Sequence, residues 1–406
     1  MAGQFQIAAP QPQTHRQEMF DLIAKAFSQA WGYFTFRDMC SHGYIDHSLY
    51  DWKTSRIGLL ESGEDAQRRI VTHFGVWGYT MRIGSARVHC GGIGAVATDF
   101  DHRRRGFMRR TIRAAIAAMR VAGYDLSILF GIDDFYHRFG YTRAWSDLHY
   151  AVKVNDLPVE KPRLLLKAAL PHPQLDRLFN RLNARMTGTA VRPTFSRPNP
   201  LYKHQGFSWK QGRHLAGYIG VVDRGARLDV IEATGDAHQC LCAAAELARR
   251  FGADEVRFVN LPYNSELAAA LRAGNCVVEI QHRRCGAAMV RLINLPQALA
   301  KMSGELGRRL RNSPLAGWRG RLLIADGTDS AMLSIESGRL DVQPVDTRSA
   351  AHLIRGGDEM AQLLIGSDEP LRIAAAHGIR LHGDGRLLLP VLFPAQHPML
   401  HMLDRF

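Results

Sequence analysis

The chain has 406 residues, of which 46% are apolar, and a formal net charge of +14. This length exceeds what one ordinary hydrophobic core supports, so two or three domains are expected. The mixture of apolar and charged residues excludes a disordered chain, and the absence of any run of about eighteen apolar residues excludes a membrane-spanning helix.

The first residues and the cysteines indicate a cytoplasmic protein. The N-terminal segment lacks the apolar core of a secretory signal. The six cysteines show neither a C-x-x-C spacing nor a disulfide framework, so we expect reduced thiols. A metal site is not expected, because His42 and His47 lack a third ligand at a suitable spacing.

The first ninety residues predict one helix followed by strands. The helix starts near Glu18, and a segment rich in aromatic residues follows at 31–52. Strands are predicted at 57–60, 70–77 and 79–89, because apolar and β-branched residues cluster there.

Residues 92–145 hold the most informative pattern. A strand over 93–98 leads into a polar turn and the run Arg103-Arg104-Arg105-Gly106. The next residues predict a helix that ends at Gly123, since apolar side chains recur at steps of three and four. A second strand is predicted over 126–132, where an almost continuous apolar run suggests burial on both faces.

A turn that contains glycine and opens a helix can bind an anion. The first N–H groups of a helix have no partner within it, and the positive end of the helix dipole lies there. Arginines add charge-assisted hydrogen bonds to phosphate oxygens. A charge run is more often a solvated surface, but the strand before and the helix after this one favour a phosphate site.

Two segments carry a resemblance to a known family. Val96-Ala97-Thr98 followed by Arg103-x-x-Gly106 resembles the acyl-CoA pyrophosphate loop of the GNAT N-acetyltransferase superfamily. Tyr136-x-Arg138-Phe139-Gly140-Tyr141 resembles the segment that follows the next strand in many members. Together they are most similar to the Eis (enhanced intracellular survival) branch, although Met108 stands where the general pattern has a small residue.

The resemblance implies an α/β (α+β) fold of two tandem GNAT-like domains and a sterol-carrier-protein-like domain. Residues 1–152 would be the catalytic domain that binds acetyl-CoA, completed by a strand at 147–152. Residues 153–286 would be a degenerate second GNAT-like domain, since strand, helix and strand recur there without an arginine–glycine loop. Residues 287–406 would be the third domain, which supplies the C-terminal carboxylate.

The same resemblance implies that the protein is an N-acetyltransferase that needs no metal. It would transfer the acetyl group of acetyl-CoA to primary amines such as aminoglycosides, other polyamines or lysine-type acceptors. The amine would attack directly within a ternary complex. A homo-oligomer, a hexamer in this branch, would be the assembly. The residues expected to bind acetyl-CoA are Val96, Ala97, Thr98, Arg103, Arg104, Arg105, Gly106, Phe107, Met108 and Arg109.

Two groups are expected to move protons, and three aromatic residues are expected near the acceptor. Tyr136 would protonate the leaving thiolate, its alternative being a packed aromatic. The main-chain carboxylate of Phe406 would act on the ammonium, its alternative being a frayed terminus. Trp31, Phe34 and Phe36 either line the acceptor pocket or pack into the core.

Two other functions remain open on the residues alone. The chain could bind an acyl-CoA or other ligand without catalysis. It could also bind a polyanion or nucleic acid through residues 177–222, which hold eight Lys or Arg, no Asp or Glu, and interleaved aromatic residues. The favoured interpretation is that residues 177–222 form a solvated or subunit-facing surface.

Overall fold

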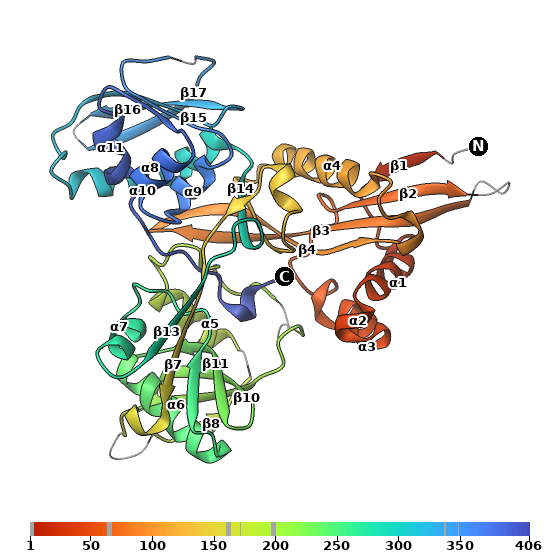
Figure 1. The fold of residues 1–406 in the computed structure, drawn as a ribbon, viewed down its shortest axis with the longest axis vertical. Helices are drawn as coiled ribbons and strands as arrows, with labels where there is room; N and C mark the ends of the chain where they lie inside the picture. The colour runs from red at the N-terminus through yellow and green to blue at the C-terminus, as the bar shows by residue number, and fades with distance from the viewer. Residues whose placement is uncertain are drawn as a thin grey trace.

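The computed structural model describes residues 4–62, 67–159, 164–170, 172–195, 200–336, 338–347 and 349–406. They form three β-sheets with their helices, arranged as three lobes around the C-terminus (Figure 1). The predicted α+β class is confirmed. Among these residues, none of the helices is long and apolar enough to cross a membrane.

The first sheet has the strand order β1-β2-β3-β4-β5-β14-β6, and only β4 and β5 pair in parallel. Its strands are β1 (Phe5–Ala8), β2 (Arg56–Ser62), β3 (Gln67–Ile83), β4 (Ala86–Thr98), β5 (Leu126–Gly131), β6 (Thr142–Arg143) and β14 (Ala287–Leu292). Helices α1 (Arg16–Ala26), α2 (Ser28–Trp31) and α3 (Tyr33–Met39) precede β2, and α4 (Phe107–Val121) joins β4 to β5. Side chains of α1 and of α4 pack into different core clusters, on opposite faces of the sheet.

The predicted break between two strands near Gly78 is wrong. β3 runs through Gly78 without interruption, and the turn to β4 comes at Gly84 and Ser85. Gly78 and Gly91 are partners in the ladder, and a Cβ on either one would press against Tyr124. These glycines therefore mark a close packing contact and not a turn.

The second sheet has the strand order β13-β7-β12-β11-β10-β9-β8, and β11 and β12 pair in parallel. Its strands are β7 (Asp147–Lys153), β8 (Lys167–Ala168), β9 (Gln205–Gln211), β10 (His214–Asp223), β11 (Arg227–Thr234), β12 (Glu255–Phe258) and β13 (Val277–Gln281). Its helices are α5 (Pro173–Leu182), α6 (Ala237–Phe251) and α7 (Glu266–Arg272).

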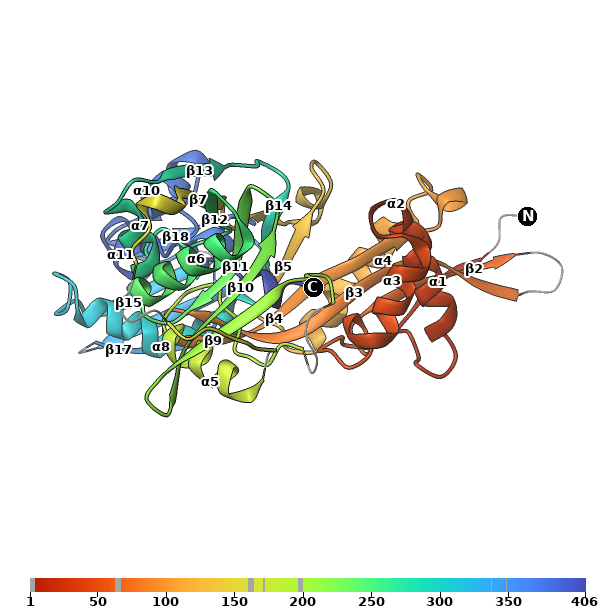
Figure 2. The ribbon, with the colours of Figure 1, turned by 90° about the horizontal axis from the view of Figure 1, so that it is seen from below.

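The first two sheets exchange strands. The prediction that residues 147–152 complete the first sheet is wrong, because β7 lies between β12 and β13 of the second sheet. In return β14, from beyond the second sheet in sequence, lies between β5 and β6 of the first. Figure 1 shows β7 and β13 running between the two lobes, and Figure 2 shows β14 next to β5. Strand periodicity gives the buried face of a strand but not its partner, so the sequence did not indicate this exchange.

The third sheet has the strand order β17-β16-β15-β18-β19. Its elements are β15 (Gly320–Ala325), β16 (Ser330–Glu336), β17 (Arg339–Pro344), β18 (Leu353–Arg355), β19 (Arg380–His382), α8 (Leu295–Arg311), α9 (Met360–Ile365), α10 (Pro370–Ala376) and α11 (Gly385–Leu392). Glu305 of α8 accepts hydrogen bonds from the backbone and hydroxyl of Ser85, at 3.2 and 2.7 Å. This buried carboxylate ties the third lobe to the β3–β4 turn of the first.

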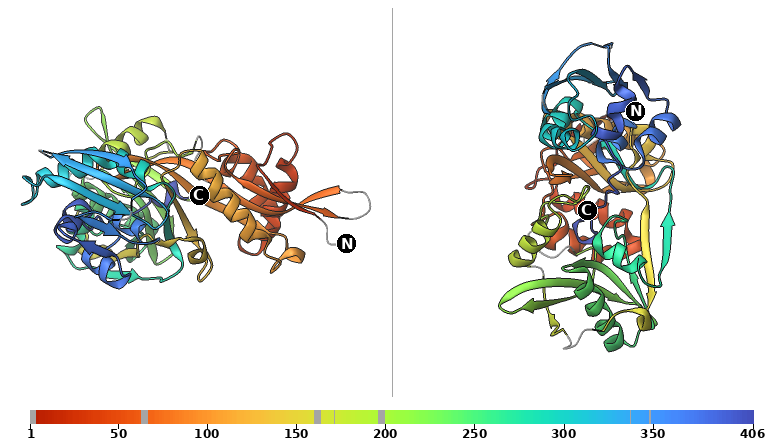
Figure 3. Two further views of the ribbon diagram at one scale, coloured as in Figure 1. Left: turned by 90° about the horizontal axis from the view of Figure 1, so that it is seen from above. Right: turned by 90° about the vertical axis from the view of Figure 1, so that its left-hand side faces the viewer.

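The last residues leave the third lobe and return to the middle of the molecule. The C-terminus is central in every view, between the lobes of the first and second sheets (Figure 3). Phe393, Leu400 and Phe406 are buried along the way. The tail is therefore packed and not frayed.

Candidate active site

A bulge in β4 opens one edge of the first sheet. β4 pairs with β5 only up to Ile93, opposite Leu129, although both strands are fully described. Ala95 has a φ of +48°, and the register with β3 shifts between His73 and Gly75. The backbone of Val96, Ala97 and Thr98, expected to bind pantetheine, therefore has an edge that β5 does not occupy.

His73, on the neighbouring strand β3, supports this bulge. Its Nδ1 lies 2.7 Å from the Ala95 carbonyl oxygen and its Nε2 lies 2.7 Å from the Tyr50 hydroxyl. A carbonyl can only accept, so Nδ1 carries the proton and Nε2 accepts from Tyr50. Burial lowers the pKa of His73 to about 4, only partly offset by the bond to Ala95. The imidazole is thus neutral at physiological pH.

The predicted anion site lies at the start of α4. Gly106 is the N-cap residue, with a φ of +78°, and no side chain caps the first N–H groups. Arg103, Arg104 and Arg105 are exposed beside it, with the Arg103 guanidinium 4.0 Å from the centre of the Phe100 ring. Free N–H groups and accessible guanidinium groups fit a phosphate-bearing ligand such as acetyl-CoA.

The remaining residues of this loop have different surroundings. Phe107 stacks on Phe5 with ring centres 4.3 Å apart, and Met108 packs against the core under α4. Arg109 is exposed. Their side chains therefore secure the helix start or face solvent, while their backbone N–H groups lie in the first turn.

Tyr136 lies in a 3₁₀ turn after β5, on the face that α4 covers. It belongs to the core cluster of Leu129 and Met119, and its ring lies against Gly131. Burial raises the pKa of its phenol, with a further contribution from Tyr141. Among the described residues its hydroxyl has no hydrogen-bond partner, whereas the Tyr141 hydroxyl is 2.7 Å from Ser127 Oγ. Tyr136 is thus a protonated donor with no assigned acceptor.

Phe406 lies on the opposite face, against the glycines of β4. Its ring occupies the place where a Cβ of Gly92 would stand. A Cβ on Gly94 would lie 2.9 Å from the main-chain carbonyl carbon of Phe406 and 2.6 Å from the Tyr44 hydroxyl. The terminal carboxyl group therefore lies beside the β4 bulge.

Three aromatic side chains surround the Phe406 ring. The ring centres of Trp77, Tyr79 and Phe130 lie 6.4, 5.7 and 6.1 Å away. Trp77 is itself held by a hydrogen bond from Nε1 to the Tyr44 carbonyl oxygen, at 3.0 Å. Tyr44 belongs to the aromatic-rich segment 31–52, which was considered for the acceptor pocket, whereas His73, Trp77, Tyr79 and Phe130 were not predicted as site residues. The glycines at 91, 92 and 94 within a strand were the available signal, because they permit close approach of another chain segment.

The three residues expected near the acceptor are not equally placed. Phe36 is buried and packs on Tyr44, with ring centres 5.7 Å apart. Trp31 is 42% exposed and lies 6.1 Å from the Phe36 ring, whereas Phe34 is 83% exposed. Phe36 therefore reaches the site through Tyr44, and Phe34 faces solvent.

One group of side chains was not anticipated. Possible ligand atoms of Asp134, His137 and Cys285 lie within 4.8 Å of one another. Asp134 and His137 are exposed and Cys285 is partly exposed. The structure shows only this proximity of three groups that metals can use.

The second sheet differs where the first has its anion site. Helix α6 follows β11 as α4 follows β4, but its N-cap residue is Asp236, whose carboxylate accepts from Gln239 N at 3.0 Å. A carboxylate there satisfies a free N–H group and repels phosphate. The start of α6 therefore differs from the start of α4 in both its charge and its capping.

Residues 10–144 match the family model described as an acetyltransferase (GNAT) domain. The matched range holds the 103–109 loop and Tyr136 but not Phe406. No curated protein sequence matches the chain.

Solved structures resemble the chain over its whole length. A GCN5-related N-acetyltransferase from Kribbella flavida is 18% identical with a TM-score of 0.73, over 100% of this chain and 99% of that chain. One from Anabaena variabilis is 15% identical with a TM-score of 0.76, over 99% and 100%. Eis1 from Mycobacterium abscessus is 14% identical with a TM-score of 0.69, over 99% and 100%. At such identities these likenesses establish a shared fold.

Proposed function

We propose that this chain, a GNAT-type N-acetyltransferase by the match of its residues 10–144, transfers the acetyl group of acetyl-CoA to a primary amine. In this proposal Tyr136 and the terminal carboxylate of Phe406 are the groups that transfer protons. A GNAT domain implies acetyl-CoA as the acetyl donor.

The position of Phe406 carries the proposal. Its carboxyl group lies beside the β4 bulge on one face of the sheet, and Tyr136 lies on the other face beyond β5. A thioester at the unpaired edge of β4 would lie between them. Direct attack needs one group that accepts a proton from the amine and another that donates toward the departing sulfur, and this placement offers one on each side of the thioester.

Each residue group then has one task. The N-terminal turn of α4 and the arginines beside it bind the phosphates, and the backbone of 96–98 binds the pantetheine arm. His73 keeps the bulge in place through the Ala95 carbonyl oxygen. The sheet thereby orients the thioester before the amine arrives.

In the reaction a C–N bond forms and the C–S bond breaks. The attacking nitrogen gives up a proton through water to the Phe406 carboxylate. Tyr136 donates its O–H to the departing sulfur. A thiol has a reference pKa of about 8.5, below that of a phenol, so full proton transfer from Tyr136 is uphill and its hydrogen bond to the developing thiolate is the larger contribution.

The acceptor is proposed as an amine class only. A carboxylate in an aromatic surround attracts an ammonium group, through charge and through the faces of Tyr44 and Trp77. Aminoglycosides, other polyamines and lysine side chains present such groups, and the likeness to Eis1 in fold is the reason to try them first. Assembly as a homo-oligomer remains part of the proposal.

The test measures release of free thiol from acetyl-CoA with a panel of mono-, di- and polyamines. The proposal expects amine-dependent thiol release and one acetyl group added to a nitrogen of the product by mass spectrometry. Binding of acetyl-CoA without turnover on any amine would instead support a binding protein.

A further inference from the structure

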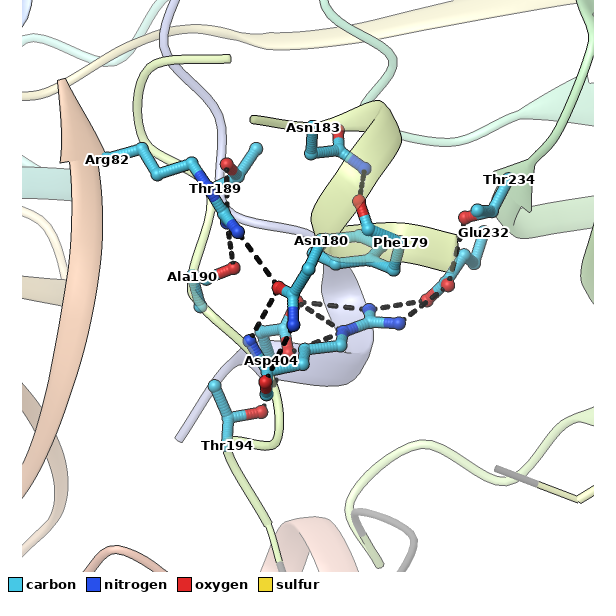
Figure 4. Close-up of polar contacts among 11 residues, drawn as sticks. Arg82, Phe179, Asn180, Asn183, Thr189, Ala190, Thr194, Glu232, Thr234 and Asp404 are labelled. Carbon is cyan, nitrogen blue, oxygen red and sulfur yellow. Dashed lines mark hydrogen bonds and ion pairs between the residues drawn. The ribbon is translucent and has the colours of Figure 1, made fainter. Parts of the chain in front are cut away.

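The tail that carries Phe406 is held by a buried ion pair from the second lobe. Arg192 forms ion pairs with two carboxylates, Asp404 of the tail and Glu232 of β11, and Figure 4 labels both of these partners. The Arg192 side chain is 10% exposed, and the side chains of Asp404 and Glu232 are each 1% exposed. These are among the least exposed charged groups near the site.

The geometry of this cluster satisfies most of its donors and acceptors. Arg192 Nε and Nη2 donate to Asp404 Oδ1 and Oδ2 at 2.9 and 3.0 Å, and its Nη1 and Nη2 donate to Glu232 at 2.7 Å each. The Thr194 hydroxyl donates to Asp404 at 2.7 Å. The guanidinium also lies 3.6 Å from the centre of the Phe179 ring. Arg192 is thus a planar bridge with bidentate contacts on both sides.

The same residue is tied to the first sheet. Asn180 Oδ1 accepts from the Arg192 backbone N–H at 3.0 Å and from Arg82 Nη2 at 2.9 Å. Arg82 belongs to β3 and also contacts the Ala190 carbonyl oxygen. Arg192 therefore has a fixed position relative to both sheets, and its contacts with Asp404 fix the position of the tail as well.

The charges in this cluster are stable near neutral pH. Burial alone would raise the pKa of Glu232, but the Arg192 guanidinium outweighs it and holds that pKa below its usual value. Burial would lower the pKa of Arg192, and the two carboxylates more than reverse this. A buried ion pair adds little net stability, because desolvation offsets attraction, yet it allows very few geometries. Here the main effect of this ion pair is to fix the position of the tail.

We propose that Arg192, held by Glu232, positions the catalytic carboxylate by fixing Asp404, two residues before the end of the tail. This inference rests on the function proposed above for Phe406. Two residues span at most about 7 Å, so an anchor at Asp404 confines the terminal carboxylate to the neighbourhood of the β4 bulge. The stretch 177–222, which invited a polyanion-binding interpretation, thereby supplies part of the tail's binding site.

The inference predicts a specific kinetic pattern for Asp404→Ala. Losing one partner of the bridge frees the tail, so kcat for amine acetylation should fall at least about tenfold. The KM for acetyl-CoA should stay within about twofold, because the 103–109 loop is untouched. Asp404→Asn keeps the size and the Thr194 hydrogen bond, and should lose less. Asp329→Ala, which breaks the ion pair to Arg120 between the first and third lobes, is the matched control and should keep both values.

A second readout follows the tail itself. Carboxypeptidase A should release Phe406 at least about tenfold faster from Asp404→Ala than from the wild-type protein or Asp329→Ala, since the terminus is 9% exposed when held. Release at the wild-type rate would overturn the inference, even if activity fell. If Asp404→Ala does not fold, the digestion is repeated with Asp404→Asn, which should release Phe406 faster than the wild-type protein, and release at the wild-type rate would again overturn the inference.

A double variant separates this inference from the proposed function. Two residues added after Phe406 should cost activity, and adding them to Asp404→Ala should cost little more, because both changes displace the same carboxylate. Fully additive losses would show that Asp404 acts elsewhere and would overturn the inference. An extension without any effect would refute Phe406 as the base, while the digestion would still report on the anchor.

Discussion

Gly92→Ala tests whether the Phe406 ring must occupy its place on β4. Gly92 pairs with Trp77 of β3 and Ile128 of β5, and its backbone is not left-handed, so alanine fits the strand itself. The added Cβ would fall within the Phe406 ring. β4 and the Phe406 ring cannot both keep their positions. We expect the ring to move, because it lies at the end of the chain and its displacement costs less free energy.

The magnitude follows from the burial that the ring would lose. Phe406 is 9% exposed, and full burial of a Phe side chain contributes about 1.5–3 kcal/mol. Losing this contribution shifts the equilibrium between held and released tail by roughly 10- to 150-fold. We expect kcat for amine acetylation to fall by up to this factor, with the affinity for acetyl-CoA unchanged.

The assay is steady-state thiol release, with the dissociation constant of acetyl-CoA measured separately. Gly304→Ala is the control: Gly304 lies within α8, and no described atom lies within 4 Å of its would-be Cβ. That variant should keep full activity and gain about 0.5–1 kcal/mol in the free energy of unfolding. A folded Gly92→Ala protein with the wild-type kcat would refute the reasoning about the ring.

Three further predictions concern other parts of the site. Arg103→Ala with Arg105→Ala should weaken acetyl-CoA binding, since each charge-assisted contact contributes roughly 1.5–3 kcal/mol; unchanged affinity by calorimetry would move the phosphate site elsewhere. Tyr136→Phe should lower kcat about a hundredfold without changing that affinity, and a normal rate would make Tyr136 a packing residue. Acid should destabilise the fold through His73, whose pKa falls from 6.5 to about 4 on folding. As the pH falls, the unfolded state takes up this proton before the folded state does. A contribution of about 3 kcal/mol to the free energy of unfolding is therefore fully present above pH 6.5 and is lost as the pH falls toward 4. Denaturant unfolding of His73→Gln should show a flatter pH dependence over that interval.

The sequence predicted the local parts of this site well. The arginine–glycine loop, α4 and β5 lie where their patterns indicated, because capping, helical periodicity and an apolar run are properties of consecutive residues. The resemblance to a known family added the acetyl donor and the proposed role of Tyr136. Those inferences needed no knowledge of distant contacts.

The non-local parts were not predictable in the same way. Whether β7 pairs with β5 or β12 depends on which lobe its neighbours join, and its alternating pattern suits either sheet. Arg192 looked like one of eight basic residues, and only the fold shows that two carboxylates surround it, one of them 212 residues away. The glycines of β4 were readable as a sign of close approach, but the sequence does not say that Phe406 makes it.

The central claim is that the terminal carboxylate of Phe406 takes part in the reaction. The most direct measurement compares kcat of the wild-type protein, with Phe406 verified as its last residue by intact mass, with kcat of a variant extended by Gly-Ser after Phe406. We predict a loss of about a hundredfold in kcat, with acetyl-CoA affinity and thermal stability retained. An extended protein that folds, binds acetyl-CoA and acetylates its amine at the wild-type rate would contradict it.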